Sequence, residues 1–283
     1  MSQRMKRFSQ NKWQVVGRTA SFMILMIYSI ISLLPLVWTL ISSIKTNTEI
    51  LTSPIALPKE PVFSNYPNAW IMADMGMYFK NTIFYVVVSV AVIVIISAMA
   101  SYILARVKQN MILSTYFTLG IMVPVHTIFL PIFLIVRNLG ILNTRLSIIL
   151  IFIATNLAMS VFILTGFMKS FPREVEEAAL IDGCTRSKSF FKIVFPLSKP
   201  GLATIATLAF LNCWNDLLMP LILITDTKLK VLTVAIQDLR GQYTQDYGLI
   251  CTGIVLSTLP VVMMYIFLQE SFVAGLTAGA VKG

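Results

Sequence analysis

Six long apolar stretches limit what this chain can fold into. A helix needs about 20 mostly apolar residues to cross the hydrocarbon core of a bilayer. The stretches of this length cover about residues 19–41, 82–104, 111–136, 146–167, 201–223 and 249–272. Only 12% of the residues are charged, which is about half the share found in an ordinary soluble domain. We therefore expect an all-α, polytopic integral membrane protein in which residues 1–283 form a single transmembrane domain of six helices.

The third apolar stretch contains Pro124 and Pro131. A proline inside a helix removes a hydrogen bond and crowds the preceding turn, so we expect either a kink or a plain bend here. His126 is the only histidine and follows Pro124 by two residues. We expect its imidazole to bond a carbonyl group that the kink frees, with a proton relay as the alternative.

The net charge of +10 is better explained by membrane topology than by nucleic acid. The chain has no basic domain with interleaved aromatic residues, so we expect no nucleic-acid binding. Cytoplasmic loops of membrane proteins carry an excess of Lys and Arg, and a cytoplasmic N-terminus puts 14 of the 22 such residues on that side. We therefore expect both termini and the loop 168–200 in the cytoplasm. The loop 45–80 is then extracytoplasmic, and its prolines and asparagines predict an ordered, non-helical cap.

The three cysteines, Cys184, Cys213 and Cys251, lack the spacing of metal ligands, and we expect neither a metal site nor a disulfide.

The first apolar stretch is too long for the core of a signal peptide, so we expect it to be retained.

The loop 168–200 is the one long charged segment between apolar stretches. Pro172 and three early glutamates are typical of a helix start, and Gly183 is typical of a helix end. A second short helix is expected from about Thr185 or Ser187 to Val194, ended by prolines at 196 and 200. Ala178, Ala179 and Asp182 lie on one slim face of the first helix. Such a face favours docking to a soluble partner, and an interfacial helix on lipid is the alternative.

The residues of this loop resemble a known signature, EAA-x3-G-x9-I-x-LP. The matching positions, with an aspartate that also fits, are Glu177, Ala178, Ala179, Asp182, Gly183, Ile193 and Pro196. Phe195 stands where leucine is usual, and Cys184 stands where alanine is common. The loop therefore resembles that of permease subunits of binding-protein-dependent ABC importers. Six spans and a long first outside loop are similar to the maltose-type carbohydrate permeases.

This resemblance implies several partners. They are a homologous second permease subunit, two ATPase subunits, an extracytoplasmic solute-binding protein and the surrounding membrane lipid. The signature residues would couple this chain to an ATPase, and the C-terminal GLTAGAVKG, with Gly279, Val281 and Lys282, would reach between the ATPase subunits. The chain has no GxxxxGK[ST] motif, so ATP and Mg²⁺ are expected only in the partner ATPases. The chain is then no enzyme itself and lies in the cytoplasmic (inner) membrane of a bacterium or archaeon.

Polar residues inside apolar stretches are candidates for the solute pathway, because they are costly in a membrane. In the fifth stretch these are Asn212, Asn215 and Asp216, which would share one helix face, with Trp214 beside them. Asn156 in the fourth stretch is a further candidate. Amides, carboxylates and aromatic faces suit the hydroxyl groups and C–H surfaces of sugars. Packing against a second subunit is the alternative role.

The resemblance implies import of a carbohydrate, with an oligosaccharide favoured over a glycerol-phosphate-like or other polar solute. An ion-coupled secondary transporter is the second class considered, but only Asp216 is a deeply placed acidic residue, and no internal repeat is evident. A membrane enzyme is the third, and no set of catalytic residues gathers at a membrane face.

Overall fold

The computed structural model describes residues 2–108, 110–239 and 246–280, and every regular element within these ranges is a helix. The prediction of an all-α membrane protein is confirmed. Among the described residues, four helical segments are long and apolar enough to cross a membrane. The number of candidate spans rises to six if each of two bent helix pairs is counted as one span. The chain divides into two compact units, Met1–Ala69 with Leu239–Leu256, and Trp70–Asp238 with Ser257–Gly283.

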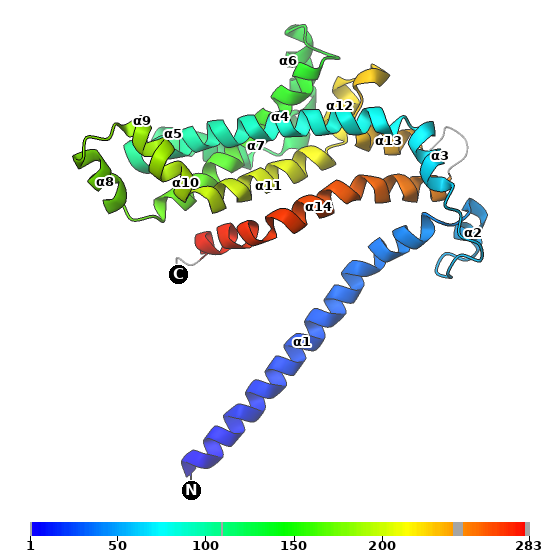
Figure 1. Ribbon diagram of the computed structural model, residues 1–283, viewed down its shortest axis with the longest axis horizontal. Helices are drawn as coiled ribbons and strands as arrows, with labels where there is room; N and C mark the ends of the chain where they lie inside the picture. Colours follow the sequence, from blue (N-terminus) through cyan, green and yellow to red (C-terminus); the bar gives the residue numbers. More distant parts are fainter. Residues whose placement is uncertain (1, 109, 240–245, 281–283) are drawn as a thin grey trace. The chain divides into compact units, whose positions relative to one another are not determined.

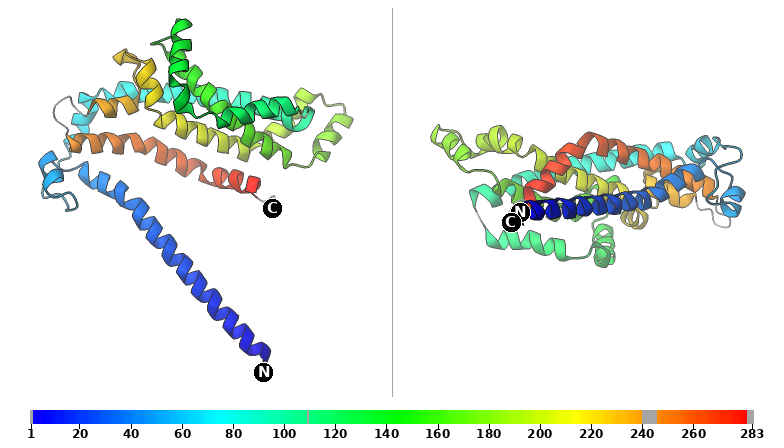
Figure 2. Two further views of the ribbon diagram at one scale, coloured as in Figure 1. Left: turned by 180° about the vertical axis from the view of Figure 1, so that it is seen from behind. Right: turned by 90° about the horizontal axis from the view of Figure 1, so that it is seen from below.

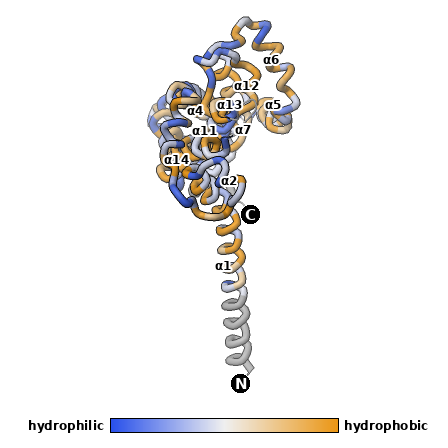
Figure 3. The backbone as a smooth tube through the Cα atoms, turned by 90° about the vertical axis from the view of Figure 1, so that its right-hand side faces the viewer, coloured by the Kyte–Doolittle hydropathy of each residue, from blue (hydrophilic) through white to orange (hydrophobic). Residues whose placement is uncertain are grey.

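The first unit contains α1 (Ser2–Ser42), α2 (Asn47–Thr52) and the start of α14 (Tyr247–Ala280). Hydrophobic residues follow one another along the coloured part of α1 (Figure 3), and Gly17–Ser42 meets the criteria for a span. Since the last carbonyl groups of a helix have no partner within it, other groups must satisfy them. Asn65 and Thr252 both donate to the oxygen of Ser43, at 2.9 and 3.0 Å.

The expectation of a non-helical loop over 45–80 is wrong. This segment holds α2, α3 (Asn65–Met72) and the first turn and a half of α4 (Met75–Tyr102). The threonine before α2 explains part of the difference, since the hydroxyl of Thr46 accepts a hydrogen bond from the backbone N–H of Glu49 at 3.2 Å. That contact is an N-cap, which favours a helix even in a segment rich in turn residues.

The second unit is built on three helices that lie side by side, α4, α7 (Arg145–Lys169) and α11 (Lys199–Asn215) (Figures 1 and 2). Small polar residues of α4 bond to α7, with Ser101 Oγ at 3.1 Å from the oxygen of Val161. Small residues let helices in a membrane approach closely. Gly201 of α11 is such a residue, because a Cβ atom placed there would lie 2.7 Å from the ring of Phe167.

Two of the apolar stretches are broken rather than continuous. The third forms α5 (Met111–Met122), then η2 (Val125–Ile128) and α6 (Phe129–Asn138), with a bend of 89° at Pro124. The fifth was expected to be one helix over 201–223, but α11 ends at Asn215 and α12 (Leu218–Leu223) follows after a break. The reason is that Asp216 adopts an extended backbone and its carboxylate bonds the N–H of Met219.

The charged loop forms α8 (Glu174–Ile181) and a second helical segment, Arg186–Leu197. The second segment consists of α9 (Arg186–Ser189), the π-helical turn η3 (Phe190–Val194) and α10 (Phe195–Leu197), and it meets α11 at 73°. We expected it to stop at Val194, whereas it continues through Pro196. The wide π turn ends at Val194, two residues before this proline, and changes the hydrogen-bond ladder, so the missing N–H costs less there.

The short helices η4 (Thr227–Leu229) and α13 (Leu232–Asp238) complete the second unit near the start of α4. Asn81 of α4 donates to the carbonyl oxygens of Lys228 and Lys230 at 2.9 and 3.0 Å. The hydroxyl of Tyr85 donates to the oxygen of Leu229 at 3.0 Å. These bonds from one helix fix the segment that follows α12.

Candidate functional site

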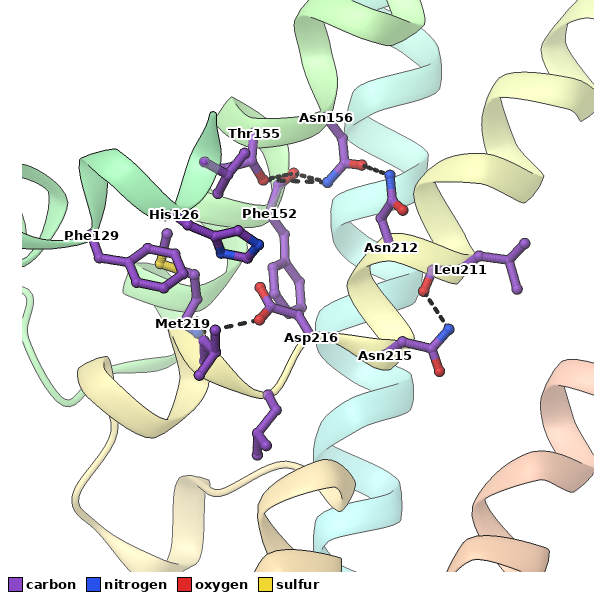
Figure 4. A pocket seen from close by; sticks show the side chains of 13 residues that line it. His126, Phe129, Phe152, Thr155, Asn156, Leu211, Asn212, Asn215, Asp216 and Met219 are labelled. Carbon is purple, nitrogen blue, oxygen red and sulfur yellow. Dashed lines mark hydrogen bonds between the residues drawn. The ribbon is translucent and has the colours of Figure 1, made fainter. Parts of the chain in front are cut away.

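The two broken stretches face a common cavity of about 540 Å³ (Figure 4). Its walls come from the break before α6, the middle of α7 and the break between α11 and α12. The lining residues are Val125, His126, Phe129, Phe152, Thr155, Asn156, Leu211, Asn212, Asn215, Asp216, Leu217, Leu218 and Met219. This volume is in the range of sites that hold a small molecule. Unwound backbone at membrane depth is tolerated where it lines such a cavity.

Asn156 and Asn212 meet across two helices. The amide of Asn212 donates to the side-chain oxygen of Asn156 at 3.0 Å, and the amide of Asn156 donates to the oxygen of Phe152 at 2.9 Å. Asn156 is buried, with 7% exposed, whereas Asn212 is exposed. The hydrogen bond between the two amides joins α7 to α11, and both residues line the cavity.

Asp216 is held in place at the helix break. Its carboxylate accepts the N–H of Met219 at 3.2 Å, and its carbonyl oxygen accepts the hydroxyl of Thr233 at 2.8 Å. The imidazole of His126 lies on the facing wall of the cavity (Figure 4). Asn215, the residue before Asp216, is exposed, and its amide donates to the oxygen of Leu211 at 2.9 Å.

Trp214 does not join the other four candidates. It is 3% exposed, stacks on Phe210 with ring centroids 5.4 Å apart, and donates its indole N–H to the oxygen of Ser257 at 3.1 Å. The helix ends at residue 215, so Asn212, Asn215 and Asp216 do not share one face of a continuous helix, but all three line the same cavity. The cavity also contains residues that sequence reasoning did not select, His126, Phe152 and Thr155. Of these, only His126 had a signal in the sequence, its place after Pro124.

The cavity offers amide, hydroxyl, imidazole and carboxylate groups beside the rings of Phe129 and Phe152. Hydroxyl groups of a ligand bond well to such donors and acceptors, and ring faces pack on C–H surfaces. Among the described residues no group of three or more His, Cys, Asp or Glu side chains could hold a metal ion. The chemistry that the lining supports is reversible binding of a polar solute.

The first helix of the charged loop ends in a Schellman motif. Gly183 has a φ of +82°, its N–H donates to the oxygen of Leu180 at 3.1 Å, and the N–H of Cys184 donates to the oxygen of Ala179 at 2.9 Å. This pairing satisfies helix carbonyls and uses a residue without a Cβ in the left-handed region. The expected stop at Gly183 therefore has the predicted physical cause.

The seven signature positions of the loop differ in exposure. Those that are exposed are Glu177, Ala178, Asp182, Gly183 and Pro196, and those that are half-buried are Ala179 and Ile193. In the predicted C-terminal tail, Gly279 belongs to the last turns of α14, whereas Val281 and Lys282 lie outside the described residues.

Comparison with known proteins shows the class of protein to which this chain belongs. Residues 93–277 match the family described as binding-protein-dependent transport system inner membrane component. The chain is 36% identical over 266 residues to the diacetylchitobiose uptake system permease protein NgcG of Streptomyces coelicolor, a match covering 93% of this chain and 88% of the relative. The chain belongs to this family of inner membrane transport components.

Two further relatives agree with this assignment, and one solved structure shares the fold. The sulfoquinovosyl glycerol transport system permease protein SmoH of Agrobacterium fabrum is 34% identical, with 94% of this chain and 95% of the relative covered. The melibiose/raffinose/stachyose import permease protein MelC of Bacillus subtilis is 35% identical, with 80% and 83% covered. A bacterial ABC transporter that imports the acidic polysaccharide alginate has a chain with the same fold, at a TM-score of 0.79 and 24% identity, covering 92% of this chain and 97% of that one.

Proposed function

We propose that this chain is the permease subunit of an ATP-driven importer and forms the pathway for a carbohydrate, foremost an oligosaccharide, delivered by a solute-binding protein. The observation that carries the proposal is the polar cavity between the two helix breaks, in a chain of a binding-protein-dependent transport family. Relatives named for diacetylchitobiose and for melibiose, raffinose and stachyose support the carbohydrate class.

The exposed amides of Asn212 and Asn215 support a wet pathway beside this cavity. A polar side chain facing hydrocarbon is costly, so these groups are expected to face either the solute or the sister permease. Asp216 and Asn156 continue the same polar lining inward. We assign these four residues to the pathway. We assign Trp214 a structural role, because its ring stacks on Phe210 and its indole N–H donates to the oxygen of Ser257.

The second candidate is an anionic solute, a glycerol phosphate or a sulfonated glycoside. The relative named for sulfoquinovosyl glycerol favours it. The carboxylate of Asp216, the one acidic group among the described residues of the cavity wall, opposes it, since like charges repel in a medium of low dielectric. Membership of a binding-protein-dependent family decides against an ion-coupled secondary transporter.

The remaining partners follow from the family. We propose a homologous sister permease and two ATPase subunits that bind ATP and Mg²⁺, so this chain hydrolyses nothing itself. The exposed face of α8 with Ala178 would dock in one ATPase, with Glu177 orienting it. The tail with Gly279, Val281 and Lys282 would lie between the ATPases. Both termini and the loop 168–200 then face the cytoplasm, and the protein lies in a bacterial or archaeal inner membrane.

The test is reconstituted transport. The complex isolated from its native membrane is placed in proteoliposomes with its solute-binding protein outside and ATP inside. Radiolabelled diacetylchitobiose, raffinose, maltotriose and glycerol 3-phosphate are offered in turn. We expect uptake of a neutral saccharide that requires ATP and the binding protein and is unaffected by ionophores. Uptake driven by an ion gradient without ATP would contradict the proposal.

A cross-link tests the docking of the loop. Ala178→Cys is expected to form a cross-link with an ATPase subunit, because this residue is exposed on α8. Leu218→Cys, an exposed residue at the helix break beside the cavity, serves as the matched control and is expected to form none. Failure of Ala178→Cys to capture an ATPase under conditions that preserve uptake argues against this docking site.

A further inference from the structure

The helix α8 has little apolar packing to hold it. None of its eight residues, all of which are described, is buried. The second helical segment of the loop is different, because Ser189, Phe190 and Val194 are buried. Phe190 and Val194 belong to a hydrophobic cluster with residues of α4, α7 and α11. If α8 transmits force to the membrane spans, contacts other than apolar packing must hold it to them.

The side chain of Tyr102, the last residue of α4, provides that attachment. It is 6% exposed, and its hydroxyl donates to the carboxylate of Glu176 in α8 at 2.5 Å. The same hydroxyl lies 3.3 Å from the carbonyl oxygen of Arg186 in α9. Its ring packs on Phe190, with centroids 5.0 Å apart. One residue of a membrane span thus contacts both helices of the loop.

A second set of contacts lies one turn further along the span, in the π-helical turn η1 (Ile103–Val107). Arg106 donates to the oxygen of Phe171 at 3.1 Å, and Arg173 donates to the oxygen of Ala105 at 3.5 Å. Arg106, Arg173 and Glu176 surround a hollow of about 110 Å³. This hollow leaves room for α8 to tilt, so the polar contacts rather than close packing set its direction.

From this geometry we infer that Tyr102 is a positioning residue, which fixes α8 on α4 so that a push on the exposed face of α8 moves the span rather than the loop alone. The inference rests on the proposed function, because it requires an ATPase that pushes. It goes further than that function because it names the contact that links the loop to a span. This contact is the Tyr102–Glu176 hydrogen bond, here called the joint, and the span that receives the motion is α4. Glu176 is the residue before the signature glutamate and points to its own chain, whereas Glu177 is exposed.

The test compares two tyrosines of the same helix in the reconstituted complex. Tyr102→Phe keeps the ring on Phe190 and removes the hydroxyl. Tyr85→Phe, the matched control, removes a hydroxyl that donates to Leu229 near the other end of α4. We expect Tyr102→Phe to raise the ATP hydrolysed per solute imported about fivefold, the effect of one lost hydrogen bond, with ATP hydrolysis itself retained. Tyr85→Phe is expected to leave that ratio unchanged.

Variants of the partner residue sharpen the comparison. Glu176→Gln keeps an oxygen that accepts the hydroxyl, so its ratio should stay near normal, whereas Glu176→Ala should behave like Tyr102→Phe. The double variant Tyr102→Phe/Glu176→Ala should be no worse than either single one. A normal ratio in Tyr102→Phe, or additive losses in the double variant, overturns the inference.

Amide hydrogen exchange in residues 174–181 separates this inference from the proposed function. Exchange should be faster in Tyr102→Phe and Glu176→Ala than in Tyr85→Phe and Glu176→Gln. Equal exchange rates in all four variants would contradict the inference that the Tyr102–Glu176 hydrogen bond fixes α8 on α4. If the unmodified complex hydrolyses ATP but carries none of diacetylchitobiose, raffinose and maltotriose, the carbohydrate proposal fails, and the joint is judged by exchange alone.

Discussion

At the scale of single residues, Gly183 is the position where backbone conformation alone decides the cost of a change. Its φ is +82°, and a Cβ atom there would meet nothing within 4 Å. Gly183→Ala is therefore expected to lower stability by about 1 kcal/mol through backbone strain rather than through a clash. Gly183→Asn, which tolerates this conformation better, should cost less. Thermal unfolding of the purified chain measures both, and an alanine variant as stable as the parent would contradict the assignment.

Asp216 combines a structural and a chemical role that two substitutions separate. Asp216→Ala removes the acceptor of the Met219 N–H, so it should lower stability by about 1 kcal/mol, the usual effect of a lost cap. Asp216→Asn keeps a side-chain oxygen and should retain stability, while it removes the negative charge from the cavity. Uptake of glycerol 3-phosphate by the reconstituted complex should then rise relative to that of neutral saccharides. An unchanged preference would place the carboxylate outside the pathway.

At the scale of helices, the apolar stretches predict where spans occur but not where they break. Pro124 predicts the first break, because a proline has no backbone N–H to donate within a helix. The break after Asn215 also has a proline nearby, Pro220, whose ring opposes a helix that continues through Asp216. This proline did not enter the prediction from sequence, because Asn212, Asn215 and Asp216 fit one face of a continuous helix equally well. The break depends on Thr233 and the N–H of Met219 bonding Asp216, and such contacts are not visible in a sequence. For that reason the sequence predicted that the three polar residues lie together, as they do at the cavity, but not the helix break at Asp216.

The crossing of α7 and α11 provides a prediction about helix packing. A Cβ atom at Gly201 would lie 2.7 Å from Phe167, whose ring is buried and packs against Phe171 at 5.1 Å. Gly201→Ala should therefore lower stability by about 1–3 kcal/mol, as overpacking does.

Gly166→Ala in α7 is the control for this change, since nothing lies within 4 Å of a Cβ atom there. It should be neutral or stabilising, because alanine favours a helix over glycine. Thermal unfolding of the two variants in one detergent measures the difference. Equal stability would mean that α7 and α11 do not approach as closely as described.

At the scale of the whole molecule, the distribution of Lys and Arg predicts the orientation in the membrane, and a native cysteine tests this prediction. Cys184 in the charged loop is half-buried, whereas Cys213 and Cys251 are buried in spans. If the loop 168–200 is cytoplasmic, a membrane-impermeant maleimide should label Cys184 in inside-out vesicles and not in intact cells. Expressing this chain alone keeps an ATPase from covering the loop.

The reverse pattern is expected on the other side of the membrane. Leu57 is 72% exposed in the segment 45–80, so Leu57→Cys in a Cys184→Ser background should react in intact cells. Lys and Arg are the residues that set orientation, and the 14 assigned to the inner side outnumber those outside. Labelling of Cys184 in intact cells would invert the topology. It would also put the Tyr102–Glu176 joint on the side of the membrane that lacks ATP, so both the coupling loop and its attachment to α4 would lose their proposed role.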